Sequence, residues 1–186
     1  MTMAAAMTLP ADGGRATAGH LPAALLADGL GDAGGGGGRR PRDVKVASHS
    51  VRPREESLDT TRAFVRRTMR AWRIDGLADD LALVVTELVT NALRHGLNAR
   101  GAASVDVALY STEKRLMCVV SDPSDEVPVR MTPDLARSSG RGLQIVEALS
   151  MYWGWTALPR DDGSHGKSVW AVFTLDGVAP EPARAG

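Results

Sequence analysis

This chain is poor in the residues on which several classes of protein depend. Its 186 residues include one cysteine, Cys118, which cannot form an internal disulfide, and four histidines without zinc-ligand spacing. Lys plus Arg and Asp plus Glu both number 22, so the net charge is zero and no basic field attracts nucleic acid or anionic lipid. We therefore expect a reducing compartment and no direct nucleic-acid partner.

A long hydrophobic run is also missing. The longest such stretch, at residues 81–85, is far shorter than the roughly 20 residues that span a membrane, and it ends at Thr86 and Glu87. Residues 1–7 lack the basic region and the sustained hydrophobic region of a secretory signal. These features predict a cytoplasmic protein without a membrane anchor.

Composition divides the chain into three parts. Residues 1–42 are rich in Ala and Gly, with a run of glycines at 34–38, and bury too little apolar surface to offset the entropy of ordering. This composition predicts that residues 1–42 form a disordered leader. Residues 43–177 carry periodic patterns and form the predicted domain, and residues 178–186 predict a flexible tail.

Hydrophobic periodicity predicts eight elements in the middle part. In chain order they are a strand at 44–47, helices at 58–72 and 77–95, strands at 105–109 and 116–120, a helix opening at 140–142, and strands at 151–158 and 167–175. The second helix has the clearest buried face, formed by Leu81, Val84, Val85, Leu88 and Ala92. The order β-α-α-β-β-α-β-β predicts an α+β fold, a mixed sheet with helices on one face.

The second helix also carries a polar stripe beside its apolar face. Glu87, Asn91 and His95 stand four residues apart, a spacing that places them on one flank of the helix. Polar groups close to a core lose about 1–3 kcal/mol each when their hydrogen bonds are not made. The stripe therefore predicts a polar ligand or partner beside it.

Further polar residues stand at the ends of predicted elements: Asp122 after a strand, Gly140 and Gly142 before a helix, and Ser168 in the last strand. Together with the stretches ELVTNALRHG at 87–96 and SGRGLQIV at 139–146, they resemble the N, G1 and G2 boxes and the final G-[ST] element of the GHKL (Bergerat) ATP-binding fold. The resemblance covers residues 44–176 and is closest to the anti-sigma-factor serine/threonine protein kinases. It implies a two-layer sandwich with a mostly antiparallel sheet.

The resemblance also implies roles for the matched residues. Asn91 would ligate Mg²⁺ through its amide oxygen, Glu87 would be the general base, and Asp122 would accept a hydrogen bond from the adenine amino group. The glycine turn would bring backbone N–H groups to the phosphates at a helix start. The full nucleotide-binding set that the resemblance implies is Asn91, His95, Asp122, Gly140, Arg141, Gly142, Leu143 and Ser168.

Two other nucleotide motifs are absent. The stretch before Ser168 looks like a P-loop, but Asp161 stands where the first glycine belongs and a strand follows instead of a helix. The glycines at 140 and 142 follow a long loop, whereas a Rossmann turn follows a strand. The G1 box itself departs from D-x-G-x-G, because Ser124 stands where glycine is usual.

Three functions remain to be weighed. The first is an ATP- and Mg²⁺-dependent kinase that binds a sigma factor and phosphorylates an anti-sigma-factor antagonist protein, and Glu87 favours it because a pure binder needs no base there. The second is a non-catalytic, ATP-responsive module that sequesters a partner, and the altered G1 box favours it. The third, a histidine kinase, is disfavoured because a Gly-rich leader precedes the domain. The sequence does not set the oligomeric state, and a homodimer is compatible with it.

Overall fold

The described helices and strands follow one another along the chain in the order that its periodicity predicts. The computed structural model describes residues 44–96, 104–126, 128, 142–159 and 165–175. The described strands are β1 (Lys45–Val51), β2 (Val105–Ser111), β3 (Arg115–Asp122), β4 (Tyr152–Pro159) and β5 (His165–Thr174). The described helices are α2 (Ser57–Trp72), the short 3₁₀ helix η1 (Asp75–Leu77), α3 (Ala78–Gly96) and α4 (Gly142–Leu149).

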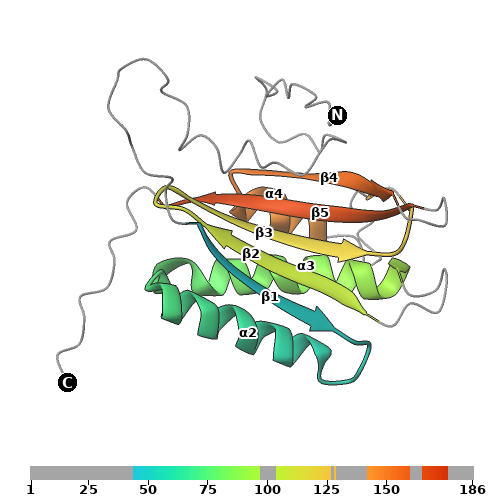
Figure 1. Cartoon of the computed structure of the whole chain (residues 1–186), viewed down its shortest axis with the longest axis horizontal. Helices are drawn as coiled ribbons and strands as arrows, with labels where there is room; N and C mark the ends of the chain where they lie inside the picture. The colour runs from blue at the N-terminus through green and yellow to red at the C-terminus, as the bar shows by residue number, and fades with distance from the viewer. Residues whose placement is uncertain (1–43, 97–103, 127, 129–141, 160–164, 176–186) are drawn as a thin grey trace, which may run out of the picture.

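The predicted α+β class, with helices on one face of a sheet, is confirmed. The five described strands form one sheet in the order β1-β2-β3-β5-β4, and α2, α3 and α4 lie on one side of it (Figure 1). The predicted leader at 1–42 and tail at 178–186 lie outside the described residues.

The predicted mostly antiparallel sheet is confirmed. Each neighbouring pair of described strands is antiparallel, so no parallel pair among them makes the sheet mixed. β3 and β4 do run parallel, as strands joined through a helix often do. They are not neighbours, however, since β5 turns back from β4 and pairs with both of them. Because β5 lies between β3 and β4, each of these parallel strands has β5 as an antiparallel neighbour.

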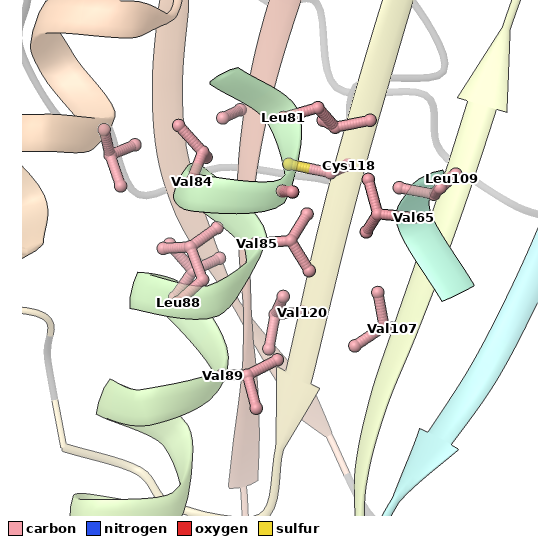
Figure 2. Packing of buried hydrophobic residues seen from close by; sticks show 14 of the residues in the cluster. Val65, Leu81, Val84, Val85, Leu88, Val89, Val107, Leu109, Cys118 and Val120 are labelled. Carbon is pink, nitrogen blue, oxygen red and sulfur yellow. The ribbon is translucent and has the colours of Figure 1, made fainter. Parts of the chain in front are cut away.

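The core lies between the helices and the sheet, as Figure 2 shows. The predicted face of α3 is confirmed: Leu81, Val84 and Val85 have no exposed surface, and Leu88 and Ala92 are 3% exposed. These side chains pack in one cluster with the helix-facing residues of the sheet, among them Cys118 and Val120. None of the helices in the described ranges is both long and apolar enough to cross a membrane.

The other face of the sheet carries a smaller cluster. Met117 and Val119 of β3 and Trp170 and Val172 of β5 are buried there. Successive side chains of a strand point to opposite faces. The residues of β3 and β5 that lie between those of the smaller cluster, such as Cys118 and Ala171, therefore belong to the core on the helix side. This alternation decides which polar residues of the two strands share a face with the helices.

The buried thiol of Cys118 makes stability depend on pH in the alkaline range. Burial raises the pKa of Cys118 from 9.0 to about 12, so the folded protein keeps the thiol protonated where the unfolded chain ionises it. This contribution is complete below pH 9 and is lost at about 1.4 kcal/mol per pH unit between pH 9 and 12.

We expect the free energy of unfolding, measured in urea, to decrease between about pH 8 and about pH 10.5. The decrease should be about 2 kcal/mol larger for the wild type than for Cys118→Ala. The alanine variant has a lower starting stability because it leaves a cavity, so the comparison uses the change with pH in each protein. Equal changes in the two proteins would show that the thiol ionises as readily in the folded state as in the unfolded chain.

Candidate functional site

The polar stripe on α3 is half-buried at Glu87 and Asn91. Glu87 and Asn91 are each partly exposed, and neither side chain forms a hydrogen bond or ion pair with another described residue. Their neighbours differ, because Thr86 and Thr90 donate their hydroxyl protons to the carbonyl oxygens four residues earlier, at 2.6 and 2.7 Å. His95 belongs to α3, but its side chain lies outside the described part. The stripe thus presents one carboxylate and one amide without a partner among the described residues.

The first residue of α4 lies directly against this pair. A Cβ atom added to Gly142 would stand 2.8 Å from Glu87 Oε2 and 3.2 Å from Asn91 Nδ2. Glycine therefore lets the start of α4 approach the stripe without displacing either side chain, and the positive end of the helix dipole lies beside the Glu87 carboxylate. The side chain of Leu143, the next residue, is buried in the core. A contact between Leu143 and a ligand would therefore be made by its backbone. Gly140 and Arg141 lie outside the described residues.

The substitution Gly142→Ala should impair function while sparing stability. The atom that the new methyl group meets is the end of the flexible Glu87 side chain, which can rotate away. Alanine also favours a helix more than glycine does, by up to about 1 kcal/mol. We expect a melting temperature close to that of the wild type, with nucleotide-dependent activity reduced at least about tenfold because the carboxylate is displaced.

A second glycine provides the matched control for this substitution. A Cβ added to Gly154 would meet three atoms of the Trp170 ring at 2.5 to 3.0 Å, and a buried indole cannot rotate away as a carboxylate can. Gly154→Ala should therefore lower stability by about 1–3 kcal/mol. If Gly142→Ala destabilised the protein as much as Gly154→Ala, Gly142 would be a packing residue and not part of a site.

Asp122, at the end of β3, is held by two donors. Lys167 of β5 is its register partner, and Lys167 Nζ donates to Asp122 Oδ1 at 3.0 Å. The backbone N–H of Ser124 donates to the same oxygen at 2.9 Å, which closes a turn of the kind that Asp favours. The side chains of Asp122 and Lys167 are only 1% and 7% exposed. The altered G1 box is therefore ordered at Ser124, and it surrounds a buried ion pair.

Ser168 does not join Asp122. It is the register partner of Ser121, and the two hydroxyl oxygens are 2.6 Å apart in a hydrogen bond. By strand alternation both serines face away from the helices, on the side of Trp170, whereas Asp122 and Lys167 share the helix side. The residue that β5 contributes beside Asp122 is Lys167, which is not among the residues that the family resemblance implies.

One signal in the sequence points to Lys167. The apolar residues Val169, Ala171 and Phe173 alternate along β5 and belong to the core, and Lys167 lies in phase with them. A lysine in phase with a core face is rarely buried unless it is paired, so it indicates a buried acidic partner. The pattern does not name that partner, because pairing between β3 and β5 is a long-range property.

The selected residues lie on elements that meet. α3 contacts both β3 and α4, and Figure 1 shows the end of β3 and the start of β5 at the same side of the molecule. The family model of the histidine kinase-like ATPase domain matches residues 51–171, well over half of the chain. The chain belongs to this family. A comparison with curated proteins found no match.

The matched range of the histidine kinase-like ATPase domain holds each residue selected from the sequence, and it also holds Lys167. Membership establishes the ATP-using class and the GHKL superfamily, but not the branch within it. In the described part of the chain, no three His, Cys, Asp or Glu side chains gather as a metal site. Mg²⁺ commonly keeps phosphate and water oxygens among its ligands, so Asn91 would supply one protein ligand to an ion held at the phosphates.

Proposed function

We propose that this histidine kinase-like ATPase domain is a cytoplasmic, ATP- and Mg²⁺-dependent serine/threonine protein kinase. By its resemblance to the anti-sigma-factor kinases, its partners would be a sigma factor, which it binds, and an anti-sigma-factor antagonist, which it phosphorylates. The observation that carries the proposal is the Glu87 carboxylate, unpaired among the described residues, one turn before Asn91 and against the glycine start of α4. A module that only bound nucleotide would not need a carboxylate at this place.

The residues fit ATP as the phosphoryl donor. Asn91 offers a hard oxygen for Mg²⁺, which when bound neutralises charge on the phosphates. The close approach at Gly142 brings the start of a helix, where anions are favoured, next to Asn91. The Asp122 carboxylate would accept a hydrogen bond from the adenine amino group. Each end of the nucleotide therefore has a chemically suitable group in the described residues.

The proposed reaction gives Glu87 one task. Its carboxylate takes the proton of a serine or threonine hydroxyl on the antagonist. That hydroxyl oxygen forms a bond to the γ-phosphorus as the bond between this phosphorus and the β,γ-bridging oxygen breaks, so the products are a phosphorylated side chain and ADP.

The nucleotide site is tested by thermal melting with Mg-ATP. At about 100 times its Kd, a ligand stabilises the folded state by about 2.7 kcal/mol, which for a chain of this size is roughly 5–10 °C. We expect this rise in the wild type, and we expect Asn91→Ala to lose most of it because the metal ligand is gone. Asp80→Asn, an exposed change in the first turn of the same helix, should keep the full rise. An undiminished rise in Asn91→Ala would exclude Asn91 as a ligand.

Two features of the G1 box favour the second candidate, an ATP-responsive module that sequesters a partner without catalysis. Ser124 stands in place of glycine, and Asp122 already accepts a hydrogen bond from Lys167. A pull-down from the native cell followed by a phosphorylation assay separates the two candidates. Transfer of phosphate to a serine or threonine of a captured protein supports the kinase. Capture with ATP-dependent affinity but without transfer supports the sequestering module.

A further inference from the structure

Within the described residues, the ion pair of Asp122 and Lys167 leaves hydrogen-bonding capacity unused on both partners. Asp122 Oδ1 receives two donors, whereas Oδ2 receives none from the described residues. An ammonium group has three N–H donors, and Asp122 Oδ1 is the acceptor found for Lys167 Nζ within the described ranges. The pair therefore presents an acceptor beside unused donors, on the face of the sheet that the helices cover.

A purely structural role does not account for this pair well. β3 and β5 are already joined by their backbone register over the whole of β3. Two well-packed hydrophobic residues in place of a buried ion pair are often neutral or stabilising, because removing two charges from water is costly. Its unused groups would also lose free energy if nothing met them. Both points favour a ligand that completes the pair.

The base of ATP has the complementary pattern. On its Watson–Crick edge adenine has an amino group that donates and, next to it, a ring nitrogen, N1, that accepts. Guanine has the reverse order there, a carbonyl that accepts and an N1–H that donates. An acceptor beside a donor on the protein therefore matches adenine, and it opposes guanine at both positions.

We propose that Lys167 is a second residue that reads the base: its ammonium group donates to adenine N1 while Asp122 Oδ2 accepts from the amino group. This inference rests on the proposed ATP site and adds a specificity-determining residue to it. Lys167 also compensates the charge of the buried Asp122 carboxylate, which lets Asp122 act as an acceptor in a site that excludes water.

The test measures binding of base analogues to the wild-type protein by titration calorimetry with Mg²⁺. The ligands are ATP, 1-deaza-ATP, which has C–H in place of N1, and purine riboside triphosphate, which lacks the amino group. Loss of a hydrogen bond to a charged group corresponds to about 10- to 100-fold in affinity, so each analogue should bind that much more weakly than ATP.

The Lys167→Met variant locates the effect. It should bind ATP and 1-deaza-ATP with nearly equal affinity, while it still prefers ATP to purine riboside triphosphate because Asp122 remains. Lys114→Met, which removes an exposed lysine in the β2–β3 turn, should show the wild-type preferences. A lysine that served only to hold the strands together would not produce a loss of discrimination confined to N1.

The possible failures are distinguishable. If ATP itself does not bind, the proposed function fails and the base-reading role fails with it. If ATP binds and 1-deaza-ATP binds the wild type equally well, the role of Lys167 is overturned while the ATP site stands. This wild-type comparison decides the question even if Lys167→Met does not fold.

Discussion

Replacement of Glu87 by glutamine is expected to lower the rate of phosphoryl transfer by about 10²–10⁴-fold and to leave the affinity for Mg-ATP nearly unchanged. Glutamine has the size of glutamate but cannot accept a proton, so it removes the base and keeps the contact with Gly142. The measurement is single-turnover transfer from labelled ATP to the captured antagonist, together with calorimetry for binding. Glu55→Gln, an exposed change before α2, should behave as the wild type.

The result separates three descriptions of the stripe. A slow variant that still binds ATP identifies Glu87 as the base. A variant that transfers phosphate at the wild-type rate would place the base elsewhere and leave Glu87 a solvated helix flank. A variant that no longer binds ATP would make Glu87 a binding residue, since a catalytic base contributes little to ground-state affinity.

The second large effect is expected on stability. Lys167→Met leaves the Asp122 carboxylate buried without its partner, and breaking a buried pair in this way costs about 3–5 kcal/mol. The double variant Lys167→Met with Asp122→Leu should recover most of this loss, because two apolar side chains then replace two charges. Urea denaturation of the wild type, both single variants and the double variant gives the complete cycle.

Exposed Lys114→Met is the control for removal of a lysine, and its stability should stay within about 0.5 kcal/mol of the wild type. The contrary outcome would be a Lys167→Met variant as stable as this control. The carboxylate of Asp122 would then have found water or another donor, and the cost of leaving it buried without Lys167 would be absent.

Much of the fold follows from local pattern. The buried face of α3 and the order of the elements were predictable, because a period of 3.6 or 2 residues records which side chains face a core. The helix at 77–95 is found as Ala78–Gly96, and the last two strands begin or end within two residues of their predicted bounds. The spacing of Glu87 and Asn91 likewise places them on one flank of the helix without any tertiary contact.

The candidate site was less predictable at β5. Ser168 was selected because it follows a Gly-Lys pair in a known motif order, yet its hydroxyl bonds Ser121 on the side away from the helices. A shift of one residue along a strand exchanges the two faces of a sheet. Motif order therefore identified the strand β5, whereas the face on which each of its side chains lies depends on the strand register.

Local periodicity was sufficient for the helices, the strands and the stripe of Glu87 and Asn91, because these depend on neighbours within a few positions of the chain. Three features depended instead on contacts between distant segments: the insertion of β5 between β3 and β4, the approach of Gly142 to the stripe, and the pairing of Asp122 with Lys167. Strand register and helix packing are set by the whole core, so no single segment encodes them.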